Sequence, residues 1–309
     1  MIKNDFKTNI TKRSPFFYVG DKYKLMPQLK LLMPDRINNY IEPFVGGGSS
    51  LLNVDAKNYI ANDLDYHVIE LHKYLIKFAK NIDKLFSILY RIIDEYKLSC
   101  SYIGRTVSED LKRKYIKTYY SVYNKESYNK LKLHYNKNQE LIEELYILLI
   151  YGFNHMIRFN LAGDFNLPVG NVDFNKNVVS ALNSYIDFAK VNSIQFHNCD
   201  YKEFLGKIKI KTNDYVFLDP PYYISLSEYN KFWSLKDEKE LYDILDELDR
   251  KGICFGVTNL VHHKGKTNNI LKDWAKRYHI HYIKSNYISF NDNTIKKDSK
   301  EIFITNYEK

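Results

Sequence analysis

The sequence predicts an α/β fold in which a mostly parallel β-sheet is covered by helices on both faces. Short apolar runs bounded by turn residues alternate with amphipathic stretches near both ends of the chain, and this alternation is typical of parallel sheets. The 309 residues are enough for two domains of about 100–200 residues each. A long middle stretch without strand signals indicates that a second unit is inserted into the first.

The first predicted element is a strand at 40–45, followed by three glycines at 46–48 and a second short strand at 59–61. Glycines that directly follow an apolar run mark a functional turn rather than a linker. The residues after the glycines are expected to be helical, starting at Ser49 or Ser50. The segment therefore predicts strand, glycine loop, helix and strand.

Strands and helices resume near Ser193, where apolar runs again alternate with charged amphipathic segments. The expected strands lie at 194–200, 214–218, 252–259 and 301–307, and the expected helices at 202–208 and 236–252. Together with the N-terminal elements they make one α/β domain from residues 1–70 and 190–309.

The stretch 71–189 differs from both flanks. Residues 106–151 are helix-prone and rich in Lys and Tyr, and no strand signal appears before the loop after Phe159. We therefore expect 71–189 to be an inserted, mostly helical domain.

Charge and cysteine content limit the class of protein. The net charge of +9 favours polyanionic partners, but 38 of the 46 cations are lysines, so a solvated Lys-rich surface of biased composition stays an alternative. Three scattered cysteines without a CxxC pair argue against a disulfide framework and a thiolate zinc site. No apolar run reaches the roughly 18 residues of a membrane span, and no signal peptide is visible. We expect a cytoplasmic protein.

The glycine loop lets the backbone approach a ligand closely. Asp63 follows Gly46 by 17 residues at the end of the next apolar run, where a carboxylate could bind ribose hydroxyls. A dinucleotide-binding turn would have a third glycine where this chain has Leu51, which disfavours an NAD-dependent oxidoreductase. A structural turn followed by a capping Asp remains the alternative.

A second candidate site is Asp219, Pro220, Pro221 and Tyr222, which directly follow the buried run 216–218. Its side chains should emerge at the carboxyl edge of the sheet, where open α/β folds bind ligands. Two prolines donate no N–H and hold an extended backbone with free carbonyls. A carboxylate, a carbonyl and an aromatic face are together suited to a planar group that carries an NH2.

With these motifs the chain resembles the Dam-type family (D12 class, alpha group) of S-adenosylmethionine-dependent DNA adenine-N6 methyltransferases. The motifs stand in the family's order, and Asp21 replaces a glycine of the first. The similar segments are 14–22, 42–49, 62–63, 158–170, 219–222, 258–259 and 301–307.

The resemblance implies a Rossmann-like class I methyltransferase sheet, with 71–189 as the DNA-recognition domain and 158–170 as a DNA-probing hairpin. It implies S-adenosyl-L-methionine as cofactor and no metal, because the sulfonium is already an activated leaving group. The implied catalytic residues are Asp219, Pro220, Pro221 and Tyr222. The implied cofactor contacts are Tyr18, Lys22, Glu42, Phe44, Gly46, Gly48, Asp63, Asp200 and Asp219. The implied DNA contacts are Arg113, Arg158, Phe159 and Asn160.

The expected activity is methylation of adenine N6 in double-stranded DNA, at a sequence that the motifs do not specify. A cognate restriction endonuclease is a further expected partner, a membrane is not, and the protein is expected to be a monomer or weak dimer. Methylation of RNA or another planar amine, and a catalytically degenerate DNA-binding relative, remain alternatives. On this interpretation the excess positive charge should lie on the insert, around residues 105–137.

Overall fold

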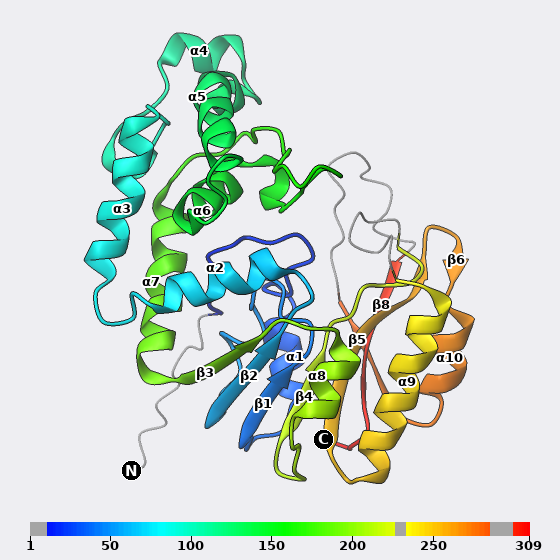
Figure 1. Ribbon diagram of the computed structural model, residues 1–309. Coiled ribbons are helices and arrows are strands. Elements are labelled where there is room, and N and C mark those ends of the chain that lie inside the picture. Colours follow the sequence, from blue (N-terminus) through cyan, green and yellow to red (C-terminus); the bar gives the residue numbers. More distant parts are fainter. Residues whose placement is uncertain (1–10, 226–232, 285–298) are drawn as a thin grey trace, which may run out of the picture.

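The computed structural model describes residues 11–225, 233–284 and 299–309 (Figure 1). These residues form an eight-stranded sheet in the order β3-β2-β1-β4-β5-β8-β7, with β6 paired to β5. The strands are β1 Asn39–Glu42, β2 Asn58–Asn62, β3 Ser193–His197, β4 Tyr215–Leu218, β5 Cys254–His263, β6 Lys266–Thr267, β7 His279–Ile283 and β8 Ser299–Thr305.

The sheet is parallel from β3 through β2, β1 and β4 to β5, and β8 lies antiparallel between β5 and β7. The first five strands follow the order 3-2-1-4-5 of doubly wound nucleotide-binding folds, whose strand order reverses beside β1. Ligands bind such sheets at the carboxyl ends of the strands on either side of that reversal. The α/β fold with a mostly parallel sheet is therefore confirmed.

Helices cover both faces of this sheet. They are α1 Met26–Leu32, α2 Tyr66–Ile76, α3 Ile82–Glu95, α4 Glu109–Lys114, α5 Tyr119–Tyr135, α6 Ile142–Tyr151, α7 Lys176–Val191, α8 Tyr201–Lys207, α9 Leu235–Arg250 and α10 Asn269–Ala275, with short 3-10 turns at Ser101–Ile103 and Phe153–His155. Along β4, Tyr215 and Phe217 join the core under α1, α2 and α7, whereas Val216 and Leu218 join the core under α8, α9 and α10. Because both faces are buried, the strand is apolar without alternation.

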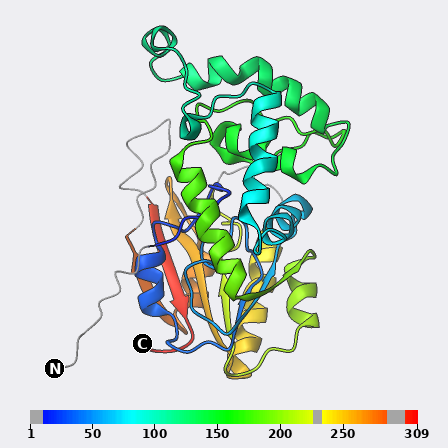
Figure 2. The same cartoon turned by 90° about the vertical axis from the view of Figure 1, so that its left-hand side faces the viewer.

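The helices α2 to α7 stand between β2 and β3 in the chain, and α3 to α6 lie beyond one end of the sheet (Figures 1 and 2). Residues 145–151 of α6 are completely buried and belong to the same hydrophobic core as the sheet face under α7. The insert thus packs on the sheet through a continuous core. Domain boundaries at residues 71 and 189 stay a prediction.

The prediction of a helix directly after the glycine loop is wrong. Residues 49–54 make a single turn, in which the Val54 N–H donates to the Ser50 carbonyl at 3.1 Å, and the next helix is α2. The Asn53 side chain ends the turn, because its amide donates to the Ser49 and Lys12 carbonyls at 2.7 Å each. Glycine and serine next to the turn are also poor helix formers.

The other predicted strands and helices are present within a few residues. The sequence reasoning missed α1, α10, β6 and β7. These elements are short, and β7 alternates His279 and His281 with apolar residues rather than forming an apolar run. Among the helices of the described residues, none has the length and apolar character needed to cross a membrane.

Candidate active site

The glycine loop leaves β1 at the carboxyl edge of the sheet, at the strand-order reversal. Gly46 and Gly48 have φ angles of +46° and +74°, a conformation that side chains rarely adopt. A Cβ on Gly47 would lie 2.9 Å from Tyr18 Cβ, and one on Gly48 would lie 2.9 Å from the His72 ring. The loop therefore has no room for side chains between Tyr18 on one side and His72 on the other.

Asp63 holds this loop from the end of β2. Its Oδ2 accepts the Gly46 N–H at 2.8 Å, and its Oδ1 accepts the Asp65 N–H at 2.9 Å. Burial raises the pKa of the Asp63 carboxyl to about 6, although these N–H donors act to lower it. The structure thus brings together two predicted cofactor residues, Gly46 and Asp63.

His72 of α2 holds the same loop through its carbonyl. Its Nε2 lies 2.9 Å from the Gly46 oxygen and its Nδ1 lies 2.6 Å from the Tyr185 hydroxyl. Burial lowers the pKa of His72 to about 4, so the ring is neutral near pH 7. Nε2–H then donates to Gly46, and Nδ1 accepts from Tyr185. Sequence reasoning missed this role, because His72 is one of 9 histidines without a motif.

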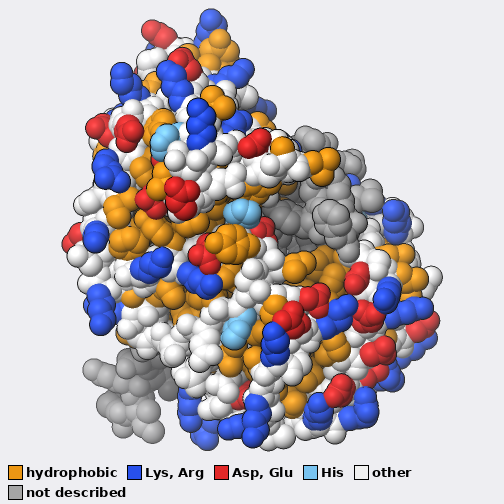
Figure 3. Space-filling view, viewed as in Figure 1, with side chains coloured by type: hydrophobic (Ala, Val, Ile, Leu, Met, Phe, Trp, Pro, Cys, Tyr) orange, Lys and Arg blue, Asp and Glu red, His pale blue; other side chains and the backbone are white. Residues whose placement is uncertain are grey.

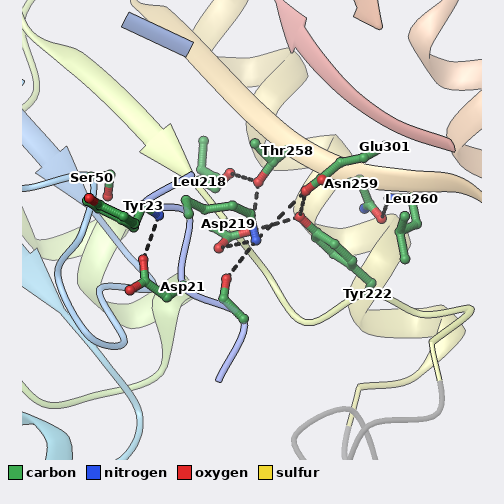
Figure 4. Close-up of polar contacts among 12 residues, drawn as sticks. Asp21, Tyr23, Ser50, Leu218, Asp219, Tyr222, Thr258, Asn259, Leu260 and Glu301 are labelled. Atoms are coloured by element: carbon green, nitrogen blue, oxygen red, sulfur yellow. Dashed lines mark hydrogen bonds and ion pairs between the residues drawn. The ribbon is translucent and has the colours of Figure 1, made fainter. Parts of the chain in front are cut away.

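Asp219 emerges at the end of β4, beside the glycine loop, and every oxygen of its carboxylate has a partner (Figure 4). Its Oδ1 accepts the Thr258 hydroxyl at 2.7 Å and lies 2.9 Å from the Tyr222 hydroxyl. Its Oδ2 pairs with Lys22 Nζ at 2.9 Å. Lys22 also donates to the Gly20 carbonyl at 3.0 Å. Predicted catalytic and cofactor residues therefore meet in one cluster.

Lys22 lies between two carboxylates. Its Nζ is 3.8 Å from Glu301 Oε1 and 5.1 Å from the centre of the Tyr222 ring. Burial acts to lower the pKa of Lys22, but Asp219 and Glu301 outweigh it and raise the pKa. The ammonium is therefore charged.

Glu301 of β8 is 1% exposed, and its Oε1 lies 2.9 Å from the Tyr222 hydroxyl (Figure 4). Its Oε2 has no hydrogen-bond partner among the described residues. The sequence reasoning placed Glu301 and Thr258 in late-strand motifs without a role, since only the sheet brings β5 and β8 beside β4.

The remaining predicted cofactor residues line the same edge. Glu42, at the end of β1, accepts the Ser50 hydroxyl, and its Oε2 has no partner among the described residues. Burial raises the pKa of Glu42 well above its usual value. Phe44 contacts the Tyr201 ring at 5.1 Å between centroids. Asp200 begins α8 and caps it, since its carboxylate accepts the backbone N–H two residues later at 2.9 Å.

Within the predicted hairpin 158–170, residues 158–166 form a turn in which Phe159 is bridged to Phe165. Phe159 stacks on His67, at the start of α2, with 4.0 Å between ring centroids. Asn160 Oδ1 accepts the N–H groups of residues 162 and 164 and so shapes the turn. The large hydrophobic side chain that the tip exposes completely is Leu161. The structure therefore uses Phe159 and Asn160 to build the hairpin.

The predicted DNA-contacting arginines are separated. The Arg158 guanidinium donates to the side chain and the carbonyl of Asn166 at 2.9 Å each, within the hairpin. Arg113 is exposed on α4, at the end of the insert farthest from the sheet (Figure 1). Segment 105–137 has nine Lys or Arg against three Asp or Glu. On the face in Figure 3, cations and acids are mixed over both the insert and the α9–α10 side, so on this face the charges do not mark out a single cationic surface.

The acceptors at this edge suit a ligand that carries hydroxyl groups. Glu42 and Asp63 present carboxyl groups for hydroxyls, and the glycine loop leaves backbone exposed where a Cβ would clash. Among residues 11–225, 233–284 and 299–309, no three His, Cys, Asp or Glu side chains are grouped to hold a metal.

The chain is similar in sequence to adenine-specific DNA methyltransferases. A family model described as D12 class N6 adenine-specific DNA methyltransferase matches residues 18–288. Type II methyltransferase M.FokI of Planomicrobium okeanokoites is 32% identical over 309 residues, covering 97% of this chain and 44% of that protein. Modification methylase StsI of Streptococcus sanguinis is 32% identical, covering 99% and 45%. DNA adenine methylase of Escherichia coli K12 is 25% identical, covering 91% and 90%. The chain spans less than half the length of the first two relatives.

Among solved structures, the rRNA methyltransferase aviRa from Streptomyces viridochromogenes matches 91% of this chain and 81% of its own, with a TM-score of 0.32 and 10% identity. A second structure of that protein gives a TM-score of 0.33.

Proposed function

Since the chain belongs to the D12 class of N6 adenine-specific DNA methyltransferases, we propose that it transfers a methyl group from S-adenosyl-L-methionine to N6 of an adenine in double-stranded DNA. The observation that carries this proposal is the position of Asp219. Its carboxylate lies at the strand-order reversal, beside a side-chain-free glycine loop, and is followed by two prolines and an aromatic residue.

The cofactor would lie along the glycine loop. Tyr18 packs on the loop from one side, and Asp63 at the end of β2 would accept the ribose hydroxyls. Glu42 has a buried oxygen without a partner among the described residues, ready for a polar group of the ligand. Phe44, Gly48 and Asp200 would complete the binding surface. When bound, the cofactor supplies a methyl group activated by its sulfonium.

The Asp219 carboxylate and the Pro220 carbonyl would each accept a hydrogen bond from one of the two N6–H groups of the adenine. The N6 lone pair is delocalised into the ring, and two acceptors would localise it and aim it at the methyl group. Catalysis then depends on positioning and on preorganised electrostatics. Pro221 keeps the backbone extended, since proline has a fixed φ and no N–H to donate.

The adenine must leave the duplex, because N6 is hydrogen-bonded inside it, and flipping costs a few kcal/mol. Tyr222 would stack on the flipped base, a contact worth about 1–3 kcal/mol. The Tyr222 hydroxyl lies 2.9 Å from both Asp219 and Glu301, which fixes the ring before the base arrives.

The hairpin 158–166 and the cationic helices α4 and α5 would contact the duplex. Phosphate contacts from residues such as Arg113 would set affinity and its salt dependence, whereas base contacts near the hairpin would set specificity. Because two similar proteins are named as type II and modification methylases, we also propose a role in restriction-modification, with a cognate endonuclease as partner.

The test is incorporation of labelled methyl groups from S-adenosyl-L-methionine into unmethylated double-stranded DNA, with RNA as the comparison. The wild-type chain should label the DNA, and sequencing the product would give its recognition site. Asp219→Ala should abolish transfer while thermal unfolding stays cooperative. Normal turnover of Asp219→Ala, or labelling of RNA alone, would refute the proposal.

A further inference from the structure

The cluster around Asp219 has more acceptors than donors among the described residues. Four carboxylate oxygens of Asp219 and Glu301 face one ammonium, Lys22, and the hydroxyls of Thr258 and Tyr222. A tyrosine hydroxyl has a single proton, so it satisfies Asp219 or Glu301 and not both. The result is a buried cluster with two carboxyl groups for one ammonium, in which Glu301 Oε2 has no hydrogen-bond partner among the described residues.

Both oxygens of Asp219 already have protein donors in this state. Its Oδ1 faces two hydroxyls, and its Oδ2 holds the Lys22 ammonium at 2.9 Å. An adenine amino group that donates to Oδ2 would have to share this oxygen with the Lys22 ammonium, and a displacement of Lys22 relieves the close approach of the two donor groups. The side chain of Lys22 is 8% exposed, and a buried ammonium that loses its carboxylate partner is strongly destabilised.

Glu301 can pair with the Lys22 ammonium when Asp219 no longer does. An ammonium has three N–H donors, and Lys22 directs two of them to Asp219 and the Gly20 carbonyl. Glu301 Oε1 lies 3.8 Å from the same nitrogen, so a small side-chain movement brings it to hydrogen-bonding distance. The Tyr222 hydroxyl already lies at 2.9 Å from Glu301 and can turn its proton to it without moving the ring.

We propose that Glu301 is a positioning residue for methyl transfer, which takes over Lys22 and the Tyr222 proton from Asp219 when the adenine amino group binds. The exchange leaves the number of hydrogen bonds and the total charge of the cluster unchanged, while one Asp219 oxygen becomes free for N6. This inference rests on the proposed function and adds a second carboxylate to it.

Two substitutions separate the charge of Glu301 from its shape. Glu301→Gln keeps the size and an acceptor for the Tyr222 hydroxyl but has no charge to pair with Lys22. Glu301→Asp keeps the charge on a shorter side chain. Glu144→Gln serves as the matched control, because Glu144 is a carboxylate of α6 that is 6% exposed and pairs with His134 away from the cluster.

The measurement is the single-turnover rate of labelled methyl transfer to unmethylated plasmid DNA, with cofactor affinity and thermal unfolding measured on the same proteins. Glu301→Gln should slow transfer by about tenfold or more, with cofactor affinity within about twofold of wild type. Glu301→Asp should be faster than Glu301→Gln, and Glu144→Gln should transfer at the wild-type rate. If Glu301 acts only through shape and hydrogen bonding, Gln is instead the better substitute.

A double-variant comparison tests the partner. In a Lys22→Met background there is no ammonium for Glu301 to take over from Asp219. Adding Glu301→Gln in this background should therefore lower the rate by less than about twofold. A full loss in that background, a wild-type rate for Glu301→Gln, or a loss of cofactor affinity as large as the loss of rate would overturn the inference. If Asp219→Ala is inactive while Glu301→Gln is unimpaired, only this inference fails and the proposed function stands.

Discussion

Protonation of His72 should destabilise the protein in mildly acidic solution. Within the described part of the chain, the groups facing its ring are the Gly46 carbonyl, the Tyr185 hydroxyl and the rings of Phe16 and Phe196, and these are uncharged. An imidazolium there would have no counter-charge among them, and Nδ1 would become a second donor facing a hydroxyl. The pKa of His72 is accordingly lowered from 6.5 to about 4 by burial.

The size and sign of the effect follow from the two pKa values. Between about pH 4 and 6.5 the unfolded chain binds a proton at His72 that the folded chain does not, so the free energy of unfolding falls as the pH falls through this window. At about 1.36 kcal/mol per pKa unit, the full loss is about 3 kcal/mol, of which about 2 kcal/mol is reached at pH 5. Above about pH 6.5 His72 is neutral in both the folded and the unfolded chain, so none of this free energy of unfolding is lost.

The assay is urea unfolding of the wild type and of His72→Gln at several pH values from 7.5 to 4.5. Glutamine keeps an N–H donor for Gly46 and cannot titrate, so the variant should be less stable at pH 7 and lose less stability on acidification. The difference between the two proteins should shrink by about 2 kcal/mol between pH 7 and pH 5. A difference that stays constant over this range would refute the reasoning.

Three further predictions concern the cofactor loop and the hairpin. Because the pKa of Asp63 is raised to about 6, cofactor affinity measured by calorimetry should weaken as the pH falls below about 6, whereas Asp63→Asn should bind weakly at every pH; a pH-independent wild type would contradict this. Gly48→Ala should cost about 1–3 kcal/mol of stability and reduce cofactor affinity, since φ is +74° and the new Cβ would meet His72 at 2.9 Å; unfolding curves that match wild type would argue against the loop geometry. Phe159→Ala combined with Asn160→Ala should reduce DNA methylation while cofactor affinity is kept, and a loss of cofactor binding would show that the hairpin serves the other ligand.

The parts of the site that the sequence could predict are those formed by residues that are neighbours in the sequence. Asp219 to Tyr222 and the glycine loop are local motifs, and each follows a buried strand, so the order of apolar runs is enough to place them at the carboxyl edge. The hairpin was expected from the resemblance of residues 158–170 to the family's DNA-probing segment. The exposure of Leu161 in place of Phe159 was not expected, because the stacking of Phe159 on His67 joins two segments that are distant in sequence.

The parts that could not be predicted depend on contacts between strands. Glu301 looks like any acid in an apolar run until β8 is placed between β5 and β7. His72 looks like any histidine of an amphipathic helix until α2 is laid over the glycine loop. The expected helix at Ser49 failed because periodicity alone does not show that the Asn53 side chain ends the turn.

The position of β8 also has a consequence for the order of folding. This strand comes last among the described elements yet lies inside the sheet, where it separates β5 from β7. The pair of Lys22 with Glu301 joins opposite ends of the described chain, and contacts of such high sequence separation form slowly. A folding intermediate can hold the glycine loop and Asp63 while Glu301 is still absent from the cluster. Recovery of methyl transfer during refolding should therefore lag behind recovery of cofactor binding.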